Sequence, residues 1–357
     1  VYDRRLYHIT WEPRDHGSNA YNEVVRIYQI AYPLVHAIDP KAIVAGPGVS
    51  AINNNQRMYE FSLFIRANLA KYMDALSIHT YTVWPPETAQ GHSVTDPNPS
   101  TPPGPYYTLA DSIHRAQALI KASIGHDLPM YSTEFGGNTK CPDPSLLPCV
   151  SMELPQAQGL IRENLILMGE GFKMAISFYG SDYVTQYEQG YYGLYYNLDP
   201  AHDWYHPYTV GPKPSAAAYA AMTYLLEGHF GVKPVTGLSG STIRGYSYAP
   251  YPSVQNGQTI IALWDFYGPR NNVTINVGVP SVTVYDWMGN GQTMQTRNGL
   301  LTVNLSKDPI YIAGVSPSMW GKDSPGAVPM VEPAPPSTAP SPPVNDPAPV
   351  STVVPTP

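Results

Sequence analysis

Short apolar, β-branched segments alternate with longer amphipathic segments over the first two-thirds of the chain. The short segments are typical of strands and lie at residues 6–10, 42–45, 75–79, 130–133 and 174–178. The longer segments repeat apolar residues with the 3.6-residue period of a helix, at residues 21–38, 58–72, 109–124, 154–168 and 216–226. Because parallel strands need a long crossover between them, this alternation predicts parallel βα units for residues 1–230.

The pattern changes after residue 230. Alternating strand-like runs at residues 242–248, 259–266, 273–277, 281–287 and 300–305 are separated by turns that contain Asn-Gly pairs. We therefore expect a small all-β module, a sandwich, over residues 231–316. Residues 317–357 form a tail, in which positions 331–357 contain 10 prolines. Such a composition cannot bury a core and predicts an extended, polyproline-like linker.

Charge and motifs exclude several classes of function. The formal net charge is -7, and no cluster of Lys and Arg is present, which argues against a nucleic-acid partner. No apolar run approaches the roughly 18 residues that a membrane span requires. The sequence has no phosphate-binding loop, no dinucleotide fingerprint and no nucleophile elbow, and we expect neither a cofactor nor a metal.

Two features bear on the compartment. Cys141 and Cys149 lie in a proline-rich loop, where a local disulfide is our first interpretation and two unrelated free thiols the alternative. Asn272 and Asn304 begin N-glycosylation sequons. Together with the low lysine content, these features favour an extracellular or cell-surface location.

Two glutamates each close a predicted strand. Glu12 ends the first strand, and Glu134 precedes a Phe-Gly-Gly turn at the end of the fourth. The carboxyl ends of parallel strands meet on one face, which is where active sites of βα proteins form. Paired carboxylates suit glycosidic cleavage, since one must donate a proton while the other is ionised. The alternative is that both are ordinary loop residues.

With these glutamates the sequence resembles the retaining glycoside hydrolases of clan A, (β/α)8 enzymes whose acid/base ends strand four and whose nucleophile ends strand seven. Glu12 matches the first position and Glu134 the second. Shorter matches follow at the ends of strands five, six and eight and resemble the family that contains β-xylosidases and α-L-iduronidases: Ala45-Gly46-Pro47, Ser77-Ile78-His79-Thr80-Tyr81 and Ser177-Phe178-Tyr179. The resemblance covers about residues 6–315.

The resemblance implies an α/β fold with strands four to eight of a TIM barrel, followed by an accessory β-sandwich. It implies a carbohydrate substrate, Glu12 as acid/base and Glu134 as nucleophile, with carboxyl groups about 5 to 5.5 Å apart. Residues expected to bind substrate are Trp11, His79, Tyr81, Tyr179, Trp204 and His206. A core role for His79 is the alternative, and the Tyr191-Tyr192 pair is assigned mainly to packing.

Two departures from the family pattern shape the hypotheses. Trp11 stands where clan A usually has an Asn that contacts the sugar 2-hydroxyl, so the substrate is bound differently or catalytic power is reduced. Barrel strands one to three are absent, so we expect an upstream segment or a second chain to complete the barrel. The alternative function is a catalytically weak or inactive, glycan-binding subunit of a cell-surface or filamentous assembly, with self-association through the Pro-rich tail.

Overall fold

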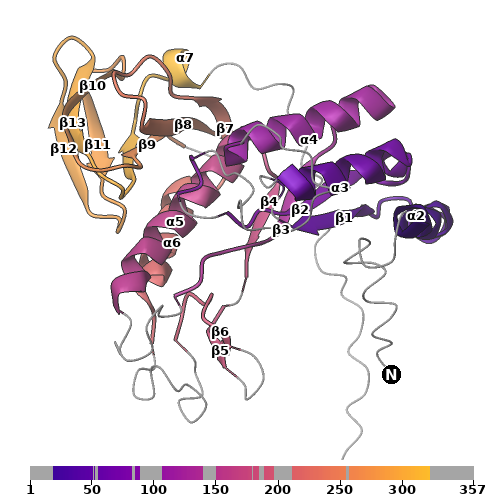
Figure 1. The fold of residues 1–357 in the computed structure, drawn as a ribbon. Coiled ribbons are helices and arrows are strands. Elements are labelled where there is room, and N and C mark those ends of the chain that lie inside the picture. The colour runs from indigo at the N-terminus through magenta and orange to yellow at the C-terminus, as the bar shows by residue number, and fades with distance from the viewer. Residues whose placement is uncertain are drawn as a thin grey trace, which may run out of the picture. The chain divides into compact units, whose positions relative to one another are not determined.

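The computed structural model describes residues 19–50, 52, 55–82, 85–88, 107–139, 150–178, 180–184, 189–196, 211–254 and 257–321. A parallel region is followed along the chain by an antiparallel region (Figure 1). The predicted strand at residues 6–10 and residues 322–357 of the predicted tail lie outside the described residues, whereas the tail's first residues, Pro317–Trp320, form a short helix instead of an extended linker. Among the described helices, none combines the length and apolarity needed to cross a bilayer.

The parallel region contains one four-stranded sheet. Its strands lie in chain order, β1 (Ala45–Ser50), β2 (Ala75–His79), β3 (Met130–Phe135) and β4 (Met174–Ser177), and each neighbouring pair is parallel. Every residue of β2 is buried, as expected for a strand covered on both faces. The prediction of parallel βα units is confirmed, whereas a closed eight-stranded barrel stays a prediction.

Helices precede, connect and follow these strands close to the predicted places. They are α2 (Asn19–Ile38), α3 (Asn55–Arg66), α4 (Leu109–Ile124), α5 (Val150–Gly169) and α6 (Pro214–Leu226). The Thr108 side chain caps α4 by accepting a bond from Asp111 N, while Gly125 closes the helix in the left-handed conformation.

Two predicted boundaries are wrong. The strand expected at residues 42–45 begins only at Ala45, because Gly46 and Pro47, which suggest a turn, instead pair with β2, and Gly48 lies at a shift in the register. The helix expected at residues 58–72 is interrupted after Arg66, since Asn68 adopts a left-handed conformation with φ of 67°. A short 3-10 helix, Leu69–Tyr72, follows it.

The antiparallel region confirms the all-β prediction. A six-stranded sheet has the order β12-β11-β14-β9-β8-β7, and a two-stranded sheet pairs β10 with β13. The strands are β7 (His229–Pro234), β8 (Ile243–Pro250), β9 (Ile260–Asp265), β10 (Arg270–Asn276), β11 (Ser281–Tyr285), β12 (Gly291–Gln295), β13 (Leu300–Leu305) and β14 (Ile310–Ala313), and a short helix α7 (Pro317–Trp320) follows them. Aliphatic side chains of both sheets form one core cluster. β7 spans the boundary predicted at residue 230, and neither β7 nor β12 is predicted from the sequence.

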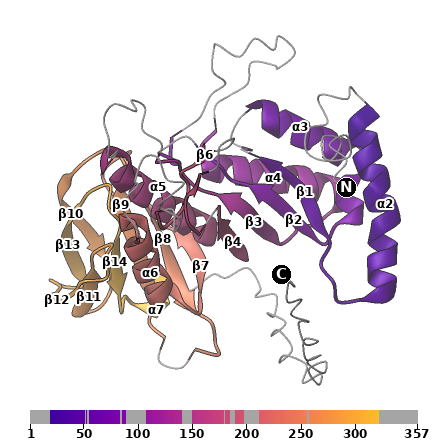
Figure 2. The same cartoon turned by 90° about the horizontal axis from the view of Figure 1, so that it is seen from below.

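Helix α5 joins the two regions through buried polar contacts. Arg162 forms an ion pair with Glu87, with Nε and Oε1 3.0 Å apart and both side chains buried. Trp264 on β9 donates its indole N–H to the same Glu87 oxygen at 2.6 Å. Tyr248 on β8 donates to the carbonyl of Leu165 at 2.7 Å, so α5 lies against this sheet (Figure 2).

One face of α2 is apolar and exposed. Val24 and Val25 are buried, whereas Ile27, Ile30, Leu34 and Ile38 are 43, 54, 58 and 87% exposed. Their spacing of three or four residues puts the exposed four on one side of the helix. Met174 and Ile176 of β4 are also exposed. Within the part of the chain that the structure describes, apolar surface therefore remains uncovered on α2 and on the edge strand β4.

We predict different costs for the same substitution on buried and exposed helix faces. Ile65→Ala on α3, where the side chain is 5% exposed, should lower the free energy of unfolding by about 2 to 5 kcal/mol, since it leaves a cavity. Ile30→Ala on α2, at 54% exposed, should change it by no more than about 0.5 kcal/mol. Urea unfolding measures both. An equally large loss for Ile30→Ala would show that this face of α2 is packed.

Candidate active site

The pairing of β2 with β3 determines which side chains meet at the carboxyl ends of the strands. His79 lies opposite Glu134 in the register, and the Thr80 amide donates to the Glu134 carbonyl at 3.0 Å. Hydroxyl pairs reinforce the contact, with Thr80 Oγ1 2.8 Å from Ser132 Oγ. Because Tyr81 follows directly, its side chain also comes from this strand end. The sequence-predicted residues His79, Tyr81 and Glu134 are thus brought together.

Two side chains contact the Glu134 carboxylate. Tyr81 Oη donates to Oε2 at 3.2 Å, and His79 Nδ1 lies 3.3 Å from the same oxygen. The Glu134 side chain is 30% exposed and the His79 side chain only 5%. Both contacts reach Oε2, and no described residue donates a hydrogen bond to Oε1. The carboxylate is therefore held in one orientation while remaining accessible.

Burial decides the protonation state of His79. It lowers the pKa of the imidazole, and the nearby Glu134 charge opposes that effect without overcoming it. Burial thus favours the neutral imidazole, whose Nδ1 lies 3.3 Å from Glu134 Oε2.

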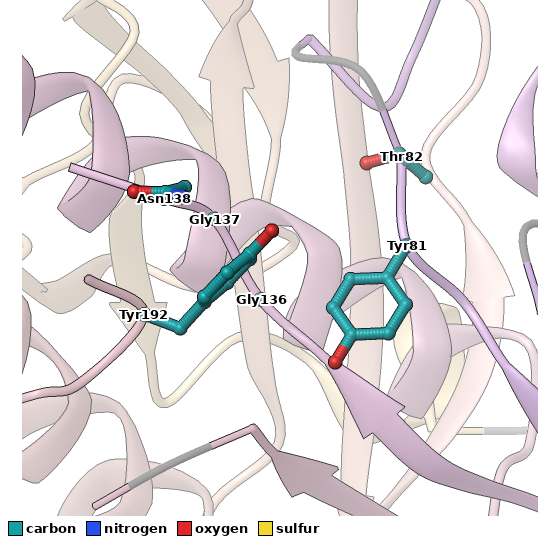
Figure 3. A pocket seen from close by; sticks show the side chains of 6 residues that line it. All are labelled: Tyr81, Thr82, Gly136, Gly137, Asn138 and Tyr192. Atoms are coloured by element: carbon teal, nitrogen blue, oxygen red, sulfur yellow. The ribbon is translucent and has the colours of Figure 1, made fainter. Parts of the chain in front are cut away.

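A pocket of about 360 Å³ adjoins this carboxylate. It is lined by Tyr81, Thr82, Gly136, Gly137, Asn138 and Tyr192. Figure 3 shows the side chains of Tyr81 and Tyr192 on either side of the Gly136 backbone. With Phe178 they form an edge-to-face aromatic trio, in which ring centroids lie 5.7 to 6.1 Å apart. Tyr81 belongs to both the pocket and the carboxylate contact, so the two form one site.

The pocket contains residues that the sequence did not assign to it. Tyr192 lines the pocket, although the Tyr191-Tyr192 pair was assigned mainly to packing, while Tyr191 itself is buried. Gly137 and Asn138 were not selected as site residues. Their place just after the Glu134 strand end was the available signal, because the loops at this end of a βα sheet form the binding face.

Several predicted residues cannot be placed. Trp11, Glu12, Tyr179, Trp204, His206, Cys141 and Cys149 lie outside the described residues. The predicted separation between Glu12 and Glu134 therefore stays a prediction, as does the disulfide. Asn272 and Asn304 are exposed on β10 and β13, where the Asn304 side chain accepts a bond from the Asn272 amide at 3.0 Å. In the described part of the chain, no cluster of His, Cys, Asp and Glu could hold a metal.

Comparison with known proteins shows the fold. No family model and no curated protein matches the chain. Among solved structures, a family 39 glycoside hydrolase from the gut symbiont Bacteroides cellulosilyticus WH2 is similar at 18% identity and a TM-score of 0.55, over 82% of this chain and 54% of that protein. A β-porphyranase of family 86 from Bacteroides plebeius is similar at 17% identity and a TM-score of 0.52, over 84% of this chain and 53% of that protein. The chain thus spans about half the length of these proteins.

We predict that His79 makes the folded state sensitive to acid. Its pKa is lowered on folding, so below the ordinary value near 6.5 the unfolded state binds the proton more readily, and stability falls as pH decreases through that value. Urea unfolding at pH 7.5 and pH 5.5 measures the loss. It should be smaller in His79→Gln than in the parent protein. Equal pH dependence in the two proteins would contradict the prediction.

Proposed function

We propose that this chain is part of a retaining glycoside hydrolase that cleaves glycosidic bonds of an extracellular polysaccharide or glycoconjugate. The observation that carries the proposal is Glu134, an accessible carboxylate oriented by Tyr81 and His79 beside an aromatic pocket. Aromatic rings present apolar faces to sugars, and nearby polar groups orient the hydroxyls. The fold shared with two solved glycosidases supports the same class of activity.

In the proposed mechanism Glu134 is the nucleophile. Its Oε1 attacks the anomeric carbon as the bond to the leaving oxygen breaks, and Glu12 donates the proton that this oxygen takes up. Glu12 then removes a proton from water, which attacks the glycosyl-enzyme, releases Glu134 and gives a product of unchanged anomeric configuration. The contacts of Tyr81 and His79 with Oε2 keep the attacking oxygen aimed at the sugar. Trp11 would stack on a sugar face.

We also propose that βα units outside these 357 residues, upstream or on a second chain, complete the barrel. The exposed apolar stripe of α2 and the exposed Met174 and Ile176 of β4 support this proposal, because they lie where further strands and helices would pack. A hydrophobic dye should bind this chain more strongly than the complete natural protein. Equal dye binding by the two would contradict the proposal.

Replacing Glu134 tests the proposed function. Glu134→Gln keeps the shape of the side chain but removes the negative charge, so kcat on a cleaved glycan should fall at least about 10³-fold while the melting temperature changes little. The substrate is first identified by testing which glycans of a panel the complete native protein hydrolyses. NMR of the first product should show the same anomer as the substrate.

The matched control is Glu170→Gln. Glu170 follows α5 and accepts a bond from Tyr246 at 2.7 Å, away from the carboxyl ends of the parallel strands. Glu170→Gln should retain the kcat of the parent protein. Full activity of Glu134→Gln would reject Glu134 as the nucleophile, and inversion of the anomer would reject the retaining mechanism.

A further inference from the structure

Segments that are distant in the sequence meet behind the aromatic pocket. Besides Tyr81 and Thr82, the lining consists of two walls: residues 136–138, which form the turn after β3, and Tyr192. These walls come from positions more than 50 residues apart, and neither lies within a helix or strand of the sheet. Their separation therefore depends on contacts between loops.

A buried ion pair links the two walls. Lys213, just before α6, contacts Asp182 with Nζ and Oδ1 2.6 Å apart, and both side chains are fully buried. Lys213 Nζ also donates to Thr139 Oγ1 at 3.0 Å, next to the first wall. Asp182 Oδ1 accepts from the Gly193 amide at 2.9 Å, next to the second. Thr139 N donates to the Tyr191 carbonyl at 2.9 Å, so the walls are also joined directly.

A buried amide on α5 makes a second link. Gln156 is 1% exposed, and its Nε2 lies 2.9 Å from the Gly137 carbonyl and 3.3 Å from the Gly193 carbonyl, donating to both. Ser215 on α6 donates to Gln156 Oε1 at 3.0 Å, which orients the amide. One side chain thus holds Gly137 of the first wall and Gly193, the residue next to Tyr192, and α5 and α6 act as its support.

Gly193 shows how closely these segments pack. A Cβ atom at this position would lie 2.2 Å from Asp182 N, a distance that no side chain can accept without backbone movement. The backbone that carries Tyr192 is therefore pressed against the Asp182 segment.

Such contacts are a costly way to gain stability alone. Burying a Lys–Asp pair removes both charges from water, and apolar residues of similar volume are often no less stabilising. Polar contacts of defined geometry do, however, select one arrangement of loops. From this placement we infer that Gln156, Lys213 and Asp182 are positioning residues, which set the distance between Tyr192 and residues 136–138 and thereby the affinity of the pocket for a sugar ring. This inference rests on the proposed function for its ligand.

Gln156→Leu provides the first test, with Gln158→Leu as a matched control. Both residues lie on α5, but Gln158 donates to Asp308 at 2.7 Å in the antiparallel region. With the glycan that the native protein cleaves, Gln156→Leu should raise KM about tenfold or more and change kcat by less than about threefold, because binding rather than Glu134 is affected. Gln158→Leu should leave both constants within about twofold. A KM of Gln156→Leu equal to that of Gln158→Leu would overturn the inference.

Hydrogen exchange gives a readout that needs no activity. The amides of Thr139 and Gly193 should exchange at least about tenfold faster in Gln156→Leu than in Gln158→Leu, since their segments lose a common support. If Gln156→Leu does not fold, the double variant Lys213→Met/Asp182→Asn removes the other link without leaving a lone buried charge, and Thr139 should show the same effect. Unchanged exchange would overturn the inference. If exchange is faster in the variant but the native protein cleaves no glycan, the proposed function is contradicted and the positioning role is not.

Discussion

The parallel pairing of β2 with β3 is the constraint on which the candidate site depends. It puts His79 opposite Glu134 and lets Tyr81 reach the same carboxylate oxygen. Because side chains alternate between the two faces of a strand, a shift of one residue would turn Glu134 away from Tyr81 and His79. The hydroxyl contacts between the two strands oppose such a shift. The register of β2 and β3 thus determines the orientation of one carboxylate.

Helix α5 connects this strand end to the rest of the molecule through polar contacts. Arg162 meets Glu87 and the antiparallel region, whereas Gln156 meets the loops of the pocket. Burial raises the pKa of Glu87, and the Arg162 guanidinium opposes that rise. Removing one member of such a pair leaves an uncompensated charge, so these contacts specify a single packing more than they add stability. The site is therefore supported from behind by a helix that contributes no residue to the pocket lining.

Periodicity was sufficient to predict the parallel units and the position of Glu134 at a strand end. It was insufficient where local sequence conflicts with tertiary pairing. The Gly46-Pro47-Gly48 sequence hides the start of β1, and β12 is largely exposed and lacks an apolar alternation. Contacts with residues distant in the sequence bring Tyr192 into the pocket lining and Gln156 behind it. A single sequence carries no local signal for such contacts. Glu12 and Trp11 lie outside the described residues, so the second half of the catalytic pair stays a prediction.

The central claim is that Glu134 is the nucleophile of a glycosidase, and covalent trapping tests it most directly. An activated 2-deoxy-2-fluoro glycoside of the cleaved sugar should form a stable ester with the nucleophile, because fluorine slows both steps of the retaining mechanism while the activated leaving group accelerates only the first. Peptide mass spectrometry of the inactivated native protein then locates the adduct. We predict one glycosyl group on the peptide that contains Glu134. An adduct on another carboxylate, or continued turnover without any adduct, would contradict the account.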